Sequence, residues 1–142
     1  LDLSGRHILI TGASSGIGKQ AAIDASHLGA QLTITGRNQA ELEKTFDLLN
    51  GKNHTLIQGD LTTPSNIKKI SAALKPLDGV VYCAGIVKPI PTKFIKEQQI
   101  DEVFSINFKS VVLLNAELLQ QQKLQLILLL ISLASWPCLW AL

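Results

Sequence analysis

Residues 11–18, with the sequence T-G-A-S-S-G-I-G, combine glycines and hydroxyl side chains in a pattern suited to binding phosphate. They follow an apolar run at residues 8–10 and precede a helix expected over residues 17–28. The first N–H groups of a helix lack partners within it, and the helix dipole places partial positive charge there. Glycines let the backbone turn sharply and approach a pyrophosphate. The spacing G-x-x-x-G-x-G differs from the commoner G-x-G-x-x-G, so a plain tight loop is the alternative.

Three further apolar segments end in residues that could contact a ligand. Gly36-Arg37 follows segment 31–35, Asp60 follows segment 54–58, and Ala84-Gly85 follows segment 79–83. If these segments are parallel strands, their carboxyl ends lie at one edge of the sheet, where ligands of such sheets bind. Four such strand ends weigh against the plain-loop interpretation.

Predicted helices alternate with the predicted strands. After the first helix, which Gly29 ends, helices are expected from Asn38 to about residue 49, from Thr63 to about residue 74, from about Lys96, and from about Asn107 to Gln121. A fifth strand is expected at residues 126–131, and Asn38 with Glu41 has the form of a capping box. No hairpin signal separates neighbouring strands, so we expect a parallel sheet covered by helices.

A chain of 142 residues with 46% hydrophobic and 17% charged residues is expected to form one globular domain. The net charge of +2, without a long basic run, gives no reason to expect a nucleic-acid partner. Cys83 and Cys138 are too few and too far apart to indicate a disulfide framework or a metal site. Reduced thiols and the lack of a visible secretory signal favour a cytoplasmic protein.

The sequence resembles the short-chain dehydrogenase/reductase family over about residues 1–121. Residues 11–18 match the T-G-x-x-x-G-x-G loop of that family without a departure. Asp60-Leu61 resembles its adenine-contacting Asp-Val/Leu pair, and residues 82–85 resemble its Asn-Asn-Ala-Gly segment with both asparagines replaced. Asn107 falls where the family places the Asn of its catalytic tetrad, which holds a water in the proton relay. Capping of the long helix is a compatible alternative for Asn107.

The resemblance implies an α/β fold, a Rossmann-type doubly wound parallel sheet with strand order 3-2-1-4-5, truncated after strand five. Residues 1–142 would form a single, partial dinucleotide-binding domain with an atypical apolar tail at residues 124–142. The implied cofactor-binding residues are Gly12, Ser14, Ser15, Gly16, Ile17 and Gly18 at the phosphates, Asp60 and Leu61 at the adenine, and Ala84 and Gly85 beside the ribose. For Asp60, a role as a helix cap or turn residue beside Thr62 is the alternative.

Arg37 bears on the choice of cofactor. A carboxylate at the end of the second strand would bind the ribose hydroxyls of NAD and repel the additional phosphate of NADP. This sequence has Gly36 at that position, followed by Arg37, whose guanidinium can pair with a 2′-phosphate. We therefore expect NADP(H) in preference to NAD(H), with a solvated surface charge as the alternative role of Arg37.

The residues expected for proton transfer are incomplete. The family uses a Tyr and a Lys four positions apart after strand five: the Tyr is the general acid, and the Lys lowers the pKa of that Tyr. The one tyrosine of this sequence, Tyr82, belongs to predicted strand four, and no Tyr-x-x-x-Lys occurs. Ser132 is the better candidate for the catalytic Ser, and Ser135 is the second choice. A strand followed by a turn without a catalytic role is the alternative.

The uncharged segment 124–142 allows three explanations. The first is that a frameshift, or a fragment end read out of frame, produced this segment. The second is that the chain is a genuine half-domain that binds nucleotide without redox chemistry. The third is that the segment is a membrane tail. The last is disfavoured because residues 126–142 are at the lower length limit for spanning and contain Pro137. An apolar fifth strand at the edge of the sheet predicts that the chain is marginally stable or self-associates.

From the resemblance we expect an NADP(H)-dependent oxidoreductase that transfers hydride between nicotinamide and a small carbonyl or alcohol substrate. The expected substrate is a 3-oxoacyl thioester, which would make the protein a 3-oxoacyl thioester reductase. The full-length protein is expected to be a homo-oligomer. The alternative is a catalytically dead, truncated or frameshifted nucleotide-binding fragment.

Overall fold

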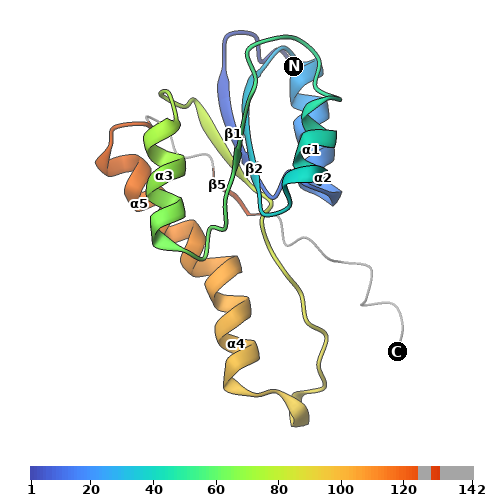
Figure 1. Ribbon diagram of the computed structural model, residues 1–142, viewed down its shortest axis with the longest axis vertical. Coiled ribbons are helices and arrows are strands. Elements are labelled where there is room, and N and C mark those ends of the chain that lie inside the picture. The colour runs from blue at the N-terminus through green and yellow to red at the C-terminus, as the bar shows by residue number, and fades with distance from the viewer. Residues whose placement is uncertain (125–128, 132–142) are drawn as a thin grey trace.

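Five parallel strands form one sheet in the order β3-β2-β1-β4-β5 (Figure 1). The computed structural model describes residues 1–124 and the backbone of residues 129–131. The strands are β1 His7–Thr11, β2 Gln31–Gly36, β3 Thr55–Gln58, β4 Gly79–Tyr82 and β5 Leu129–Ile131. The predicted strand order is confirmed. Of the fifth strand expected at residues 126–131, the described part is β5.

Helices cover both faces of the sheet, which makes it doubly wound as predicted. They are α1 Gly16–His27, α2 Gln39–Phe46, α3 Pro64–Ala73, α4 Glu97–Phe104 and α5 Ser110–Gln120, with a short 3-10 helix at Thr92–Phe94. Figure 1 shows α1 and α2 on one side of the sheet and α3 and α5 on the other. α4 extends away from the sheet in the same view.

Alternate side chains of the strands pack into two separate cores, as expected for a sheet covered on both faces. In β1, Leu9 packs in one core with Ile70 of α3 and Leu114 of α5. The next residue, Ile10, packs in the other core with Leu42 of α2. All five of these residues are fully buried, so the two cores fix β1 at the centre of the sheet.

Two details of the expected helices are wrong. α2 ends at Phe46, short of residue 49. The capping box at its start is also incomplete: Asn38 Oδ1 accepts a hydrogen bond from the Glu41 N–H at 3.2 Å, but the Glu41 carboxylate binds Lys44 Nζ at 2.6 Å. The lysine one turn further along competes for the carboxylate, which therefore does not return to the Asn38 backbone.

The helix expected from about Asn107 to Gln121 is present as α5, but it is not separate from the helix before it. α4 continues into α5 through a π-helical turn at Ser105–Lys109, so Asn107 lies inside a continuous helical stretch and cannot cap it. No glycine or proline occurs between residues 97 and 120 to separate two helices. The side chain of Asn107 is engaged with the chain after β4, as described below.

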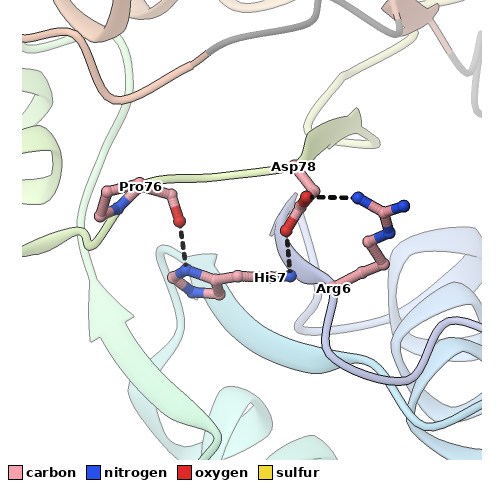
Figure 2. Close-up of polar contacts among 4 residues, drawn as sticks. All are labelled: Arg6, His7, Pro76 and Asp78. Carbon is pink, nitrogen blue, oxygen red and sulfur yellow. Dashed lines mark hydrogen bonds and ion pairs between the residues drawn. The ribbon is translucent and has the colours of Figure 1, made fainter.

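A polar cluster joins the strands at the amino edge of the sheet (Figure 2). Asp78 Oδ1 pairs with the Arg6 guanidinium at 2.9 Å, and Asp78 Oδ2 accepts a hydrogen bond from the His7 N–H at 2.8 Å. His7 Nδ1 lies 2.9 Å from the Pro76 carbonyl oxygen, and because that oxygen can only accept, Nδ1 carries the hydrogen. His7 Nε2 lies 2.9 Å from the Thr33 hydroxyl. The cluster thus ties β1 to β2 and to the segment before β4.

Candidate functional site

A cavity of about 730 Å³ lies at the carboxyl edge of the sheet, where the loops after β1, β2, β3 and β4 meet. It is lined by every residue that was predicted to bind a cofactor: Gly12, Ser14, Ser15, Gly16, Ile17, Gly18, Arg37, Asp60, Leu61, Ala84 and Gly85. Its other lining residues, not predicted as cofactor ligands, are Thr35, Gly36, Asn38, Gly59, Thr62, Cys83 and Ile106. Most of these are sequence neighbours of predicted residues, which is the signal that could have identified them.

The glycine loop packs so tightly that side chains are excluded at two positions. Gly12 has φ +68°, and a Cβ built on it would stand 2.5 Å from the Ala84 nitrogen. A Cβ on Gly18 would stand 2.3 Å from the Gly12 carbonyl oxygen. The first turn of α1 is therefore pressed against the ends of β1 and β4, as predicted for a phosphate-binding loop.

The first turn of α1 leaves backbone donors available to a ligand. Ser15 is the N-cap residue, is exposed, and makes no capping hydrogen bond through its side chain. Ser15, Gly16, Ile17 and Gly18 all line the cavity. Unpaired N–H groups and the positive end of the helix dipole thus face a space in which an anion can bind.

Thr11 connects the glycine loop to the end of β4. Its hydroxyl oxygen accepts hydrogen bonds from the N–H groups of Cys83 and Ala84, both at 3.2 Å. Thr11 is fully buried. The sequence identifies Thr11 only as the first residue of the loop motif, although a buried hydroxyl at a strand end is itself a sign of such a connection.

The end of β2 presents a positive charge beside a position without a side chain. Gly36 and the exposed Arg37 both line the cavity. The Arg37 backbone is held by Gln58, whose Nε2 donates to the Arg37 carbonyl oxygen at 3.0 Å. Within the part of the chain that the structure describes, the guanidinium forms no ion pair. It is therefore available to an anionic ligand, and its exposure is also compatible with a solvated charge.

Asp60 has the turn role that was considered as its alternative. Its Oδ1 accepts hydrogen bonds from the Thr62 N–H at 2.9 Å and from the Thr62 hydroxyl at 2.8 Å. Partial burial raises the pKa of the Asp60 carboxyl, but the bonds from Thr62 and the charge of Arg37 together outweigh it and hold that pKa below its usual value. Asp60 is thus a carboxylate at neutral pH, and it lies at the cavity wall beside the buried Leu61.

Asn107 fixes the chain that follows β4. Its Oδ1 accepts a hydrogen bond from the Ile86 N–H at 2.9 Å, and its Nδ2 donates to the Ile86 carbonyl oxygen at 2.8 Å. A Cβ on Gly85 would lie 3.3 Å from Asn107 Oδ1, so the asparagine also closes over the Ala84-Gly85 pair. π-helical turns are frequent at functional sites, and this one places Ile106 at the cavity.

The one tyrosine of the sequence does not line this cavity, and the two candidate catalytic serines cannot be placed in it. The Tyr82 hydroxyl donates to Asn115 Oδ1 at 2.7 Å within the core beneath α5, and burial raises its pKa. Ser132 and Ser135 lie outside the described residues, as does most of the apolar segment 124–142. In the described part, no helix is long and apolar enough to cross a lipid bilayer.

A doubly wound parallel sheet, with a glycine loop at the first helix and a cavity across four strand ends, defines a Rossmann-type α/β protein. The family model described as short chain dehydrogenase matches residues 6–134. The chain belongs to the short-chain dehydrogenase family.

Relatives and solved structures agree with this family. The 3-oxoacyl-[acyl-carrier-protein] reductase FabG of Rickettsia bellii is 35% identical over 121 residues, which are 85% of this chain and 50% of the relative. The short chain dehydrogenase structure from Shigella flexneri superposes with a TM-score of 0.75 at 30% identity, covering 83% of this chain and 50% of the other. A structure from Escherichia coli CFT073, complexed with NADPH, gives 0.76 at 28% identity, covering 83% and 53%. The chain spans about half the length of the curated relatives it matches.

Proposed function

We propose that this chain binds NADP(H) at the carboxyl edge of its sheet and is the cofactor-binding part of an oxidoreductase. The observation that carries the proposal is the cavity itself, in which the uncapped first turn of α1 and Arg37 provide positive charge. The residues present fit a dinucleotide, because the exclusion of side chains at Gly12 and Gly18 leaves the backbone bare where a pyrophosphate would approach it.

The proposed roles of the lining residues follow the order of the strands. Residues 14–18 would bind the phosphates, and Arg37 would pair with a 2′-phosphate. Asp60 and Leu61 would hold the adenine, while Ala84 and Gly85 would lie against the ribose. The buried, apolar Leu61 beside an ionised Asp60 suits a base that has an apolar face and polar edges.

NADP(H) is proposed over NAD(H) because of the end of β2. Gly36 offers no carboxylate for the ribose hydroxyls, and Arg37 next to it makes no ion pair within the described residues. A guanidinium can bind a phosphate through two parallel hydrogen bonds. The complex of the Escherichia coli structure with NADPH supports this choice by likeness.

The bound nicotinamide would supply hydride transfer to or from a carbonyl or hydroxyl carbon. Asn107 would keep Gly85 and Ile86 in place beside it through its two hydrogen bonds to Ile86. The names of the Rickettsia relatives support a 3-oxoacyl thioester as the substrate class of the full-length protein. The printed sequence contains no Tyr-x-x-x-Lys, so we expect the 142 residues to bind the cofactor without turnover. A catalytically dead nucleotide-binding fragment is the second candidate.

We also propose a cytoplasmic full-length protein that forms a homo-oligomer. The support for self-association is a row of exposed apolar side chains along α4, the π turn and α5: Ile100, Phe104, Phe108, Val112 and Leu119. Steps of four residues drift around an α-helix by about 40° each. The π turn at Ser105–Lys109 has more residues per turn than an α-helix. It therefore reverses this drift, and the later apolar side chains return to the same side of the helical stretch as the earlier ones. A row of this kind on an extending helix is typical of a protein interface.

Titration with NADPH, followed by cofactor fluorescence, tests the function. We expect saturable binding that adenosine 2′,5′-bisphosphate competes for, because the phosphates and the adenine would occupy the same loops. Failure to saturate would contradict the proposal. Turnover of a panel of carbonyl substrates by the 142-residue chain would contradict the expected lack of catalysis.

A further inference from the structure

A buried hydrogen bond ties the end of β4 to α5, and the proposed function gives it no role. The Tyr82 hydroxyl donates to Asn115 Oδ1 at 2.7 Å. Tyr82 is 3% exposed and packs in one core with Val111 and Leu114 of α5. Burial raises the pKa of Tyr82, so its hydroxyl keeps the hydrogen that it donates. A buried hydroxyl without a partner costs free energy, and Asn115 supplies that partner.

A second contact joins the same two segments further along. Asn107 accepts a hydrogen bond from the Ile86 N–H and donates one to the Ile86 carbonyl oxygen. Ile86 follows Tyr82 by four residues, whereas Asn107 precedes Asn115 by eight, so the two segments run in opposite directions. Eight residues of α-helix span about 12 Å, and four residues of extended chain span at most about 14 Å. The two contacts are thus similarly spaced on both segments.

The π turn brings the two asparagines toward one side of the helical stretch. In a regular α-helix, residues eight positions apart are separated by about 80° around the axis. A π turn closes its hydrogen bond over five residues instead of four, so it turns the chain less per residue and reduces this angle. Part of the π turn at Ser105–Lys109 lies between Asn107 and Asn115. Both side chains therefore reach β4 and the chain that follows it.

The residues between these two contacts form one wall of the cavity. Residues 83–85 lie between Tyr82 and Ile86, and all three line the cavity. From the side of β1, the Thr11 hydroxyl accepts hydrogen bonds from the first two of them. The path of this wall is therefore held at Thr11, at Tyr82 and at Ile86.

We propose that Tyr82 and Asn115 are positioning residues for the cavity wall at residues 83–85. Their hydrogen bond fixes the end of β4 against α5, and the bonds of Asn107 to Ile86 fix the end of the wall. The inference rests on the proposed binding of NADP(H), in which this wall contacts the cofactor. Loss of the Tyr82 hydrogen bond should therefore loosen the wall as far as Ile86 and weaken cofactor binding, although neither side chain touches the cofactor.

Three variants test this role through the affinity for NADPH and through amide hydrogen exchange at Ile86, followed by NMR without ligand. Tyr82→Phe removes the donor and Asn115→Leu removes the acceptor, each with little change of shape. We expect both to weaken NADPH binding by about three- to tenfold and to speed exchange at Ile86 by a similar factor, the range of one hydrogen bond. Asn115→Asp keeps an acceptor oxygen and should retain the wild-type values, which a role in packing alone would not predict.

Thr45→Val is the matched control. It also removes a fully buried hydroxyl, which donates to the Glu41 carbonyl oxygen at 3.1 Å, but it lies in α2 on the other side of the sheet (Figure 1). It should change neither NADPH affinity nor exchange at Ile86, and circular dichroism should show all variants folded.

Three results would overturn the positioning role while wild-type binding stands. They are unchanged affinity or exchange in Tyr82→Phe and Asn115→Leu, a loss in Asn115→Asp equal to that in Asn115→Leu, and the same losses in the control. Absence of NADPH binding by the wild type would instead overturn the proposed function, and the role in cofactor binding with it. Exchange at Ile86 is measured without ligand, so it distinguishes that failure from loss of the coupling between Tyr82 and Ile86.

Discussion

Thr11 and Thr35 lie opposite each other in the register of β1 and β2, and both are fully buried, but their hydroxyl groups differ in hydrogen bonding. The Thr11 hydroxyl accepts hydrogen bonds from the backbone of Cys83 and Ala84. The Thr35 hydroxyl has no hydrogen-bond partner within the described residues. Two identical side chains on neighbouring strands thus contribute differently to stability, since a buried polar group without a partner costs free energy.

Replacing each threonine by valine tests this difference. Thr35→Val keeps the shape and removes an unpaired hydroxyl, so the free energy of unfolding should stay the same or rise by up to about 1 kcal/mol. Thr11→Val leaves two N–H groups without their acceptor and should lower it by about 1–3 kcal/mol. Urea unfolding followed by circular dichroism measures both variants. A larger loss for Thr35→Val than for Thr11→Val would contradict the assignment.

The strands, the order of the sheet and the loop residues at the cavity could be predicted because their signals are local. Each apolar strand segment ends in a recognisable residue such as Gly12 or Asp60, and parallel connection then places those ends together. The difference between Thr11 and Thr35 could not be predicted, because it depends on Cys83 and Ala84, which are 72 and 73 residues away from Thr11 in the chain.

The hydrogen-bond partners of Asn107 could not be predicted from the sequence either. Its position predicted a functional residue or a helix cap, but its bonds to Ile86 depend on how the helical stretch crosses the loop after β4. The π turn that contains it has no sequence signal comparable to glycine or proline. Local patterns identify such a residue, whereas tertiary packing decides its partner.

The amino-edge cluster should make stability depend on acid pH. The hydrogen bond from the His7 N–H, followed by the Arg6 pair, holds the pKa of Asp78 below its usual value. The folded state therefore favours the carboxylate. Its contribution is complete above the unfolded-state pKa of about 3.9 and is lost as the pH falls through the lower folded-state pKa.

Asp78→Asn removes this titration while keeping the size of the side chain. The wild type should be the more stable at neutral pH, and its advantage should shrink between about pH 5 and pH 2. The difference should be small, because the Asp78 and Arg6 side chains are partly exposed and solvent screens their attraction. Urea unfolding across this range measures it. An advantage that grows toward acid pH would contradict the role of Asp78.

The exposed apolar row on α4 and α5 should mediate self-association. Phe104→Glu and Phe108→Glu place charges on side chains that are 61% and 62% exposed, so neither change disturbs a core. We expect the weight-average mass in sedimentation equilibrium to fall toward that of the monomer. Leu48→Glu is the matched control, since Leu48 is 52% exposed but follows α2 on the other side of the sheet. An unchanged mass in both phenylalanine variants, or an equal fall in the control, would contradict the interface.

The central claim is that the carboxyl edge of the sheet binds NADP(H) and that Arg37 recognises its 2′-phosphate. The most direct measurement is the affinity of the wild type and of Arg37→Ala for NADPH and for NADH. Loss of a charge-assisted pair should weaken NADPH binding by roughly ten- to a hundredfold, with NADH binding little changed. Lys52→Ala, which removes an exposed positive charge away from the cavity, should change neither affinity. Equal weakening of NADPH and NADH by Arg37→Ala would contradict the account.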